Sequence, residues 1–157
     1  MNDIALKDWL ENEGFPSADS LEETLRGRIA NATTPLMHAA RLGRIGFIGE
    51  LLTRGADPRE MNADGNGALW FACFADSAPC VNALIMAGAP LDSKNVNGAT
   101  ALIYAASAGR TEIVKLLLEA GADTTMATLD GFTALELAAN RACMKMLRDK
   151  HKQLQAA

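Results

Sequence analysis

Aromatic residues, histidine and cysteine are all scarce in this chain of 157 residues. Only 5% of the residues are aromatic, two are histidine and three are cysteine. No stretch approaches the roughly 18 apolar residues that a membrane-spanning helix needs, and the N-terminus carries acids where a secretory signal would be basic and apolar. The net charge of -4 is mild, so electrostatics predict neither nucleic acid nor a membrane as a partner. We therefore expect a soluble cytoplasmic protein with reduced thiols.

Apolar residues, in contrast, are plentiful. They make up 49% of the chain, against 22% charged residues, which is the balance of a folded globular protein and not of a disordered one. A chain of this length is long enough to bury about 70% of its unfolded surface. One continuous domain with a substantial core is expected.

A period of 33 residues runs through most of the sequence. Four leucines mark it, each followed three residues later by an alanine: Leu36, Leu69, Leu102 and Leu135. Glycines recur in the same register at Gly55, Gly88 and Gly121, and so do the pairs Asp64-Gly65, Asn97-Gly98 and Asp130-Gly131. This self-similarity predicts a repeat architecture, in which each unit buries its apolar face against its neighbours.

The third unit, NGATALIYAASAGRTEIVKLLLEAGAD at 97–123, shows the expected local structure. Leu102, Ala105 and Ala106 form a narrow face of a short helix, which lets neighbouring helices approach closely. In a second helix, apolar residues recur at helical spacing up to Gly121, which suits the left-handed position just past a helix end. The polar segment that follows ends in Asp-Gly, a hairpin signal. Each unit is thus predicted to be two helices and a hairpin loop.

TPLMHAA at 34–40 and TALIYAA at 100–106 resemble the T-P-L-H-x-A pattern of the ankyrin repeat family, and GxTALxxAA recurs at 131–139. The resemblance covers about residues 32–147. It implies an all-α repeat solenoid of helix-turn-helix units joined by β-hairpin-like loops, with modified helical caps at both ends. The expected units are an N-terminal cap (1–31), three repeats (32–62, 63–95 and 96–127) and a C-terminal capping repeat (128–157).

Both ends depart from the regular unit. The spacing of Leu6, Trp9 and Leu10 predicts one N-terminal helix, and Ser20 is placed to cap a second. The short spacing from Gly27 to Leu36 predicts a shortened loop without a full hairpin. Near the C-terminus, the second-helix pattern of Cys143, Met144, Met146 and Leu147 fits only with an offset of 30, so three residues are missing from the turn between the last two helices.

The second repeat is the least regular. Asp76 occupies the position filled by Gly43 and Gly109 in the other units. Gly67 stands where the other units have Thr34, Thr100 and Thr133. Loss of a capping hydroxyl should weaken the start of that helix by about 0.5–1 kcal/mol.

The sequence offers little for catalysis or metal binding. GRIGFIG at 43–49 is a weak match to a phosphate loop, because it follows a helix and its apolar residues trace a second-helix core face. His38 falls at the same repeat position as Phe71 and Tyr104, so it is interpreted as a packed residue. Cys73 and Cys80 likewise occupy core positions. We expect no cofactor, no metal and no enzymatic activity.

The resemblance implies that a partner protein would meet the hairpin tips and the concave face of the first helices. Carried over by register, the candidate contact residues on the helices are Arg41, Leu42, Phe74, Ser107 and Arg141. Those on the loops are Asp64, Asn66, Val96, Asn97, Leu129, Asp130 and Phe132, with Met61, Lys94 and Ala127 at or near the tips.

Trp70 joins this set at the position where the family usually has a histidine that ties the loop to the helix. No repeat keeps that histidine, so the sequence does not predict the loop bonding that it would provide. Trp70 either fills the space beneath the second hairpin or is half exposed.

The function expected from the resemblance is binding to one or a few proteins through this surface, as an inhibitor, chaperone or adaptor, with Phe74 as an anchor. The alternative is a structural element that pairs with a second copy through the same aromatic face. A monomer is expected under the first hypothesis and a homodimer under the second.

Overall fold

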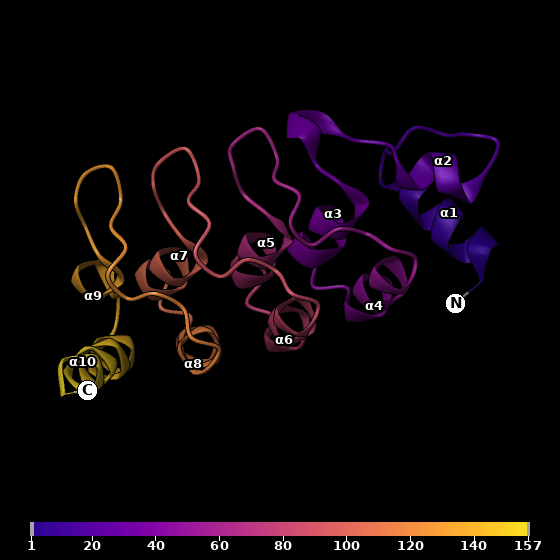
Figure 1. The fold of residues 1–157 in the computed structure, drawn as a ribbon. Helices are drawn as coiled ribbons and strands as arrows, with labels where there is room; N and C mark the ends of the chain where they lie inside the picture. The colour runs from indigo at the N-terminus through magenta and orange to yellow at the C-terminus, as the bar shows by residue number, and fades with distance from the viewer. Residues whose placement is uncertain (1, 157) are drawn as a thin grey trace.

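The structure, a computed structural model, describes residues 2–156 as a row of helix pairs stacked along one axis (Figure 1). The two termini lie at opposite ends of the row. The pairs are α1 (Asp3–Asn12) with α2 (Leu21–Leu25), α3 (Pro35–Arg41) with α4 (Ile45–Thr53), α5 (Ala68–Phe74) with α6 (Ala78–Met86), α7 (Ala101–Ser107) with α8 (Thr111–Glu119), and α9 (Ala134–Leu137) with α10 (Arg141–Ala156). A short 3-10 helix, η1 (Ala30–Ala32), precedes α3. The predicted all-α repeat solenoid is confirmed.

The repeated leucines and alanines form the core between neighbouring first helices. Leu36, Leu69 and Leu102 are at most 4% exposed, and the alanines three residues after them are fully buried. Alanine keeps the helices close together, because its side chain adds little thickness to the contact. The second helices complete the core with larger side chains, among them Ile48, Leu51, Val81, Leu84, Ile113 and Leu117.

The first helices begin where the sequence predicts. The hydroxyls of Thr34 and Thr100 accept hydrogen bonds from the backbone N–H three residues later, at 3.1 and 3.2 Å. Gly67 precedes the first residue of α5 and provides no side-chain cap, as expected. A side chain at Gly67 would come within 3.1 Å of the Met61 sulfur and 3.3 Å of the Glu60 carbonyl. A threonine at this position would therefore require the Met61 side chain and the Glu60 carbonyl to shift by a few tenths of an ångström.

Each hairpin loop is held by a side chain from within the loop, which answers the question raised by the missing histidine. The Asn62 Oδ1 accepts hydrogen bonds from the backbone N–H groups of Asp64 and Asn66, at 3.0 and 2.9 Å. Asn95 does the same one repeat later. In the last loop, the Thr128 hydroxyl accepts from the N–H of Phe132 at 3.2 Å.

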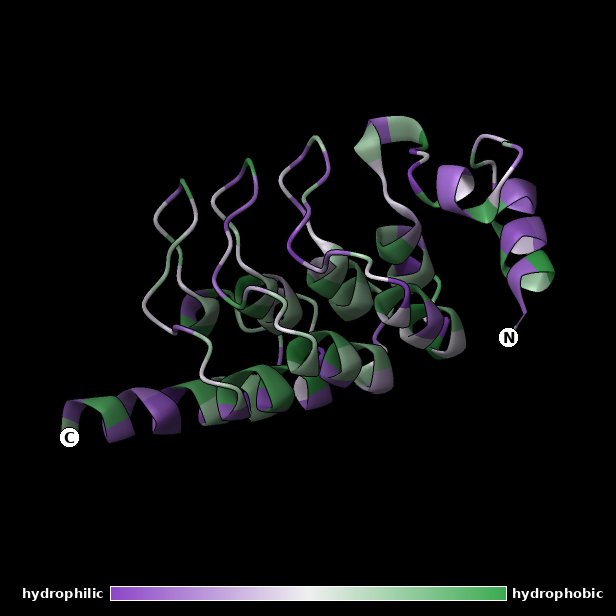
Figure 2. Ribbon diagram, turned by 45° about the vertical axis from the view of Figure 1, so that its right-hand side comes forward, coloured by the Kyte–Doolittle hydropathy of each residue, from purple (hydrophilic) through white to green (hydrophobic). Residues whose placement is uncertain are grey.

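Backbone hydrogen bonds also join each hairpin to the next. The N–H groups of Ala63, Val96 and Leu129 donate to the carbonyls of Asn31, Asp64 and Asn97, at 3.0, 2.9 and 3.0 Å. The donors lie at the hairpin tips, where Figure 2 shows hydrophobic residues. The hairpins thus form a continuous ladder above the helices, although each contributes just one such bond.

The N-terminal pair packs on the first repeat as a modified cap, and its loop is shortened as predicted. A backbone bridge joins Ile29 to Thr33, four residues apart, whereas the bridge in the second hairpin joins Met61 to Gly67, six residues apart. Ser20 caps α2 through the N–H of Glu23. The Trp9 ring of α1 stacks on Phe47 of α4, with centroids 4.0 Å apart.

At the C-terminus, the three missing residues shorten α9 as well as the turn. The Ala138 backbone is extended (φ -57, ψ 121), and α9 ends at Leu137. Cys143 and Leu147 are buried in the second-helix layer as predicted, whereas Met144 is 38% exposed and lies outside the core.

Candidate functional site

Three aromatic rings from two neighbouring repeats form a cluster, Trp70 and Phe74 of α5 with Tyr104 of α7. The Trp70 and Phe74 rings lie nearly parallel, at an interplanar angle of 12° and a centroid distance of 6.1 Å. Tyr104 lies 4.6 Å from Trp70 and 6.4 Å from Phe74 between centroids. Phe74 is 44% exposed, and the other two are half-buried. We call these three residues the aromatic cluster.

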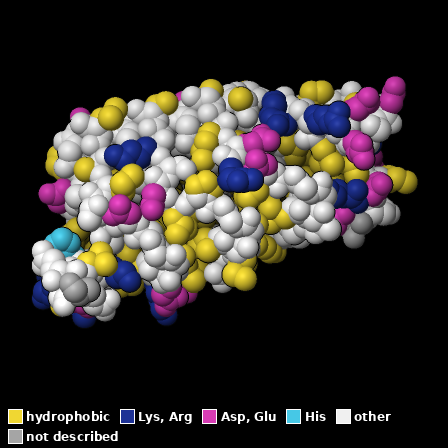
Figure 3. Space-filling model, viewed as in Figure 1, with side chains coloured by type: hydrophobic (Ala, Val, Ile, Leu, Met, Phe, Trp, Pro, Cys, Tyr) yellow, Lys and Arg dark blue, Asp and Glu magenta, His cyan; other side chains and the backbone are white. Residues whose placement is uncertain are grey.

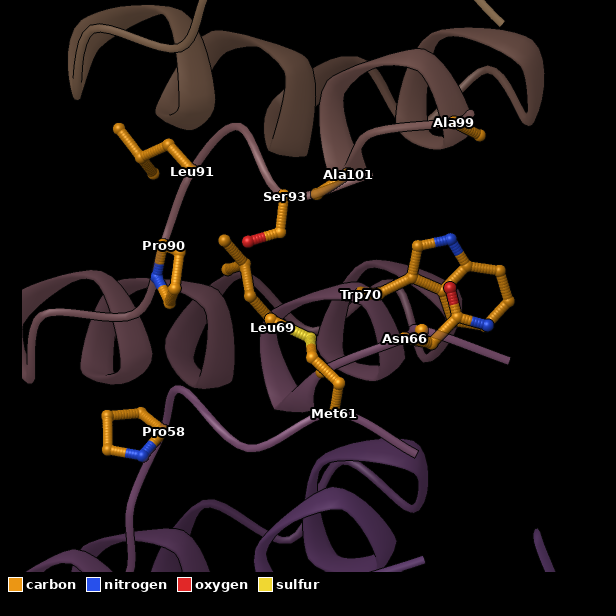
Figure 4. A pocket seen from close by; sticks show the side chains of 12 residues that line it. Pro58, Met61, Asn66, Leu69, Trp70, Pro90, Leu91, Ser93, Ala99 and Ala101 are labelled. Atoms are coloured by element: carbon orange, nitrogen blue, oxygen red, sulfur yellow. The ribbon is translucent and has the colours of Figure 1, made fainter. Parts of the chain in front are cut away.

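Trp70 combines the two alternatives considered for it. It lines a cavity of about 20 Å³ beneath the second hairpin, together with Met61, Leu69 and Pro90 (Figure 4). Its side chain is half-buried overall, and its indole Nε1 is buried without a hydrogen-bond partner among residues 2–156. Trp70 therefore fills space beneath the second hairpin and also provides the ring on which Phe74 stacks.

Arg110 holds the end of α5 in place from the following repeat. Its Nη2 donates to the Phe74 carbonyl at 3.2 Å, and its Nη1 lies 3.4 Å from an Asp76 carboxylate oxygen. Asp76 itself adopts a left-handed backbone (φ 53), as Gly43 and Gly109 do at the same repeat position. Aspartate tolerates this region better than most residues. The Phe74 carbonyl is thus held by a side chain of the following repeat, and that side chain also contacts Asp76.

Most of the predicted contact residues are exposed in the structure. These are Arg41, Leu42, Met61, Asp64, Phe74, Lys94, Val96, Asn97, Ser107, Leu129, Asp130, Phe132 and Arg141. Basic and acidic side chains are interspersed on the face shown in Figure 3, without a patch of one sign. Six of the exposed contact residues carry large apolar side chains, namely Leu42, Met61, Phe74, Val96, Leu129 and Phe132.

Asn66 was predicted to be exposed and is buried, at 9% exposure. Its Oδ1 accepts a hydrogen bond from the Asn95 Nδ2 at 3.1 Å, because the third hairpin packs over it. Register placed Asn66 beside a loop glycine, but periodicity does not show which flank of a hairpin the next repeat covers.

Two further placements need correction. Met61 and Ala127 pair with Gly67 and Thr133 at the base of their hairpins and not at the tips, and Lys94 shares their register. Arg141 is exposed but begins α10, since α9 ends too early to include it. It therefore does not extend the row of first-helix positions.

Tyr104 is not among the predicted contact residues, because it shares the register of Phe71, which indicates a packed position. The repeat pattern nevertheless indicates the contact, since the equivalent first helices of neighbouring repeats lie side by side. An aromatic residue on α7 is therefore within reach of Trp70 and Phe74 on α5. The pattern that indicated packing between repeats also indicated this cluster.

Cys73, Cys80 and His38 are buried and packed against other side chains. Burial raises the pKa of the Cys73 thiol to about 12 and raises that of Cys80 as well, so both stay protonated near neutral pH. His38 is packed as predicted, with its Nε2 2.7 Å from a Glu13 carboxylate oxygen and its ring against Phe15. No group of three or more His, Cys, Asp or Glu side chains within residues 2–156 could hold a metal ion.

Comparison with protein families now identifies the class of this stacked helical protein. The family model described as Ankyrin repeats (3 copies) matches residues 10–95 and 69–156. The chain therefore belongs to the ankyrin repeat family, whose members are generally protein–protein interaction modules and typically non-catalytic. Comparison with curated proteins finds no match. Within the described residues, no helix has the length and apolar character to cross a membrane.

Proposed function

We propose that this ankyrin repeat protein binds a partner protein through its concave helix face and hairpin tips, with Phe74 as the central anchor. The observation that carries the proposal is the aromatic cluster. Phe74 leaves 44% of its surface exposed while it stacks on a half-buried tryptophan. Large aromatic side chains on a rigid support are typical centres of binding energy in protein interfaces.

The surroundings of Phe74 support this role. Arg41 and Ser107 occupy the same repeat position on either side of it, and both are exposed. Leu42, next to Arg41, is 44% exposed. The Arg110 contacts and the stacking on Trp70 order Phe74 before binding, so little further conformational entropy would be lost when a partner covers it.

The test is capture of the partner from lysate of the native cell, followed by affinity measurement with purified variants. Phe74→Ala should weaken binding by about 30-fold or more, because truncating a hot-spot aromatic costs about 2 kcal/mol or more. Met86→Ala is the matched control, since Met86 is an apolar residue 86% exposed on α6. If the two variants bind a captured partner equally well while both stay folded, the aromatic cluster is not the binding site.

The alternative, pairing of two copies through the same cluster, predicts association that depends on protein concentration. Sedimentation of the wild-type chain over a hundredfold concentration range decides between them. A monomer throughout rejects self-pairing, and a dimer abolished by Phe74→Ala rejects the proposal of a foreign partner at this site.

We further propose that the protein acts in the cytoplasm as an inhibitor, chaperone or adaptor of its partner. The three cysteines, Cys73, Cys80 and Cys143, are all free and buried, which suits a reducing compartment. Once a partner is captured, assaying its activity with and without this chain separates inhibition from bridging.

A further inference from the structure

The last hairpin of the stack, Thr128–Phe132, presents an edge that the inner hairpins do not. In the inner repeats, the carbonyls of Asp64 and Asn97 accept the N–H of the next hairpin. The Asp130 carbonyl stands in the same register, and no N–H group of residues 2–156 donates to it. A backbone hydrogen-bond acceptor is therefore left open at the end of the ladder.

The loop glycines show how closely a neighbouring backbone approaches at this edge. A side chain added at Gly65 would meet the Asn95 Cα at 3.0 Å, and one added at Gly98 would meet the Leu129 backbone nitrogen at 2.8 Å. At Gly131, in the same register, nothing lies within 4 Å. Gly131 thus offers the same bare backbone platform as the inner glycines, without the chain that covers them.

The side chains at this edge are apolar where a cap facing water would be polar. Phe132 is 48% exposed, whereas Asn66 in the same register is buried beneath the next hairpin. Leu135 is half-buried, although its counterparts Leu36, Leu69 and Leu102 are at most 4% exposed. Leu129 at the tip is 80% exposed.

A groove of about 330 Å³ continues from this edge toward α10. Its lining includes Thr133, Leu135, Leu147 and His151. Leu147 of α10 is buried, whereas Leu135 of α9 is half-buried. The side of α9 that lines this groove is therefore only partly covered.

We propose that this terminal edge, formed by Leu129–Phe132 and Leu135, binds a hairpin turn of another protein. The turn donates one backbone N–H to the Asp130 carbonyl and places an apolar side chain against Phe132 and Leu135. The inner repeats support this occupant, since a hairpin turn that begins at Val96 or Leu129 covers each equivalent site through this hydrogen bond. The surface is separate from the aromatic cluster and does not depend on its function.

The test is selection of 12-residue peptides, random in sequence and closed into loops by a disulfide, displayed on phage against the full chain. The blocking variant is Gly131→Asn, which adds a side chain to the platform, and asparagine tolerates the left-handed backbone (φ +86) there. Gly88→Asn is the matched control, because Gly88 has φ +87 and also has nothing within 4 Å. We expect peptides that lose at least tenfold in affinity with Gly131→Asn and keep their affinity with Gly88→Asn.

A second measurement tests the backbone bond itself. Methylating single backbone nitrogens of a selected peptide should weaken binding about tenfold at one position, because a buried acceptor loses its donor there. The same peptide should bind Phe74→Ala normally, which separates this site from the proposed function. Peptides insensitive to Gly131→Asn, no N-methyl-sensitive position, or no selected peptide at all would each overturn the proposal. Self-association abolished by Gly131→Asn would assign the edge to a second copy and overturn it too.

Discussion

At the scale of single residues, loop asparagines replace the histidine that ties ankyrin loops elsewhere in the family. The Asn95 amide holds two N–H groups of its own loop and reaches Asn66 in the preceding hairpin at 3.1 Å. Asn62, Asn95 and Thr128 share the 33-residue period, so the residues that hold the loops are visible in the sequence. Periodicity alone did not predict their role, because a repeated polar residue in a loop indicates a turn but does not show which groups its side chain binds.

Gly46 and Gly49 each reduce the stability of α4, and no contact in the structure requires a glycine at either position. Both lie within α4, where a side chain added at either would meet nothing within 4 Å. Replacing each with alanine should raise the free energy of unfolding by about 1 kcal/mol, because glycine loses more backbone entropy in a helix. Urea unfolding followed by circular dichroism measures this.

Gly98→Ala serves as the opposite control for the α4 glycines. Its left-handed backbone (φ +74) and the Leu129 nitrogen 2.8 Å from the added Cβ predict destabilisation. If Gly46→Ala and Gly49→Ala also lower stability, the prediction that the two glycines weaken α4 is wrong.

At the scale of elements, the junction between α9 and α10 shows how the chain accommodates its deletion. Asn140 accepts the N–H of Cys143 at 2.8 Å and so caps α10. Its Nδ2 donates to the Gly109 carbonyl and the Thr111 hydroxyl, both at 3.2 Å. The offset of 30 in the sequence located the deletion, but the shortening of α9 was not predicted, since the alanines at 138 and 139 still fit the helical pattern.

We expect Asn140→Ala to lower the free energy of unfolding by about 1–3 kcal/mol, because it removes a helix cap and leaves part-buried groups without partners. Asn140→Asp keeps the accepting oxygen and loses the donor, so its effect should be intermediate. Hydrogen exchange of the α10 amides measures the local effect. Equal protection in Asn140→Ala and the wild type would show that packing of Cys143 and Leu147 alone holds the helix.

At the scale of the whole molecule, stability in a stacked protein depends on contacts between neighbouring units. The terminal units have one neighbour each, so they should open more readily than the middle of the stack. The three buried cysteines report on this, with Cys73 and Cys80 in the middle and Cys143 in the terminal unit.

Pulsed alkylation at pH 8, read by mass spectrometry, should therefore modify Cys143 before Cys73 and Cys80. Burial raises the pKa of the Cys73 thiol to about 12 from 9.0, so the native thiol stays protonated and reacts only after opening. By linkage, the stability contributed by this thiol is present below pH 9 and is lost as the pH rises toward 12. Simultaneous labelling of all three would indicate that the stack opens as one unit.

The sequence by itself determined the fold, the approximate extent of the repeats and most of the exposed positions, because the 33-residue period records which residues each unit must bury. The tertiary structure decided what depends on contacts between units. It buried Asn66 beneath the next hairpin, joined Tyr104 to Trp70 and Phe74, and left the Asp130 carbonyl and Gly131 uncovered. A period fixes equivalent positions along the chain, but the neighbours in space determine which of them are covered.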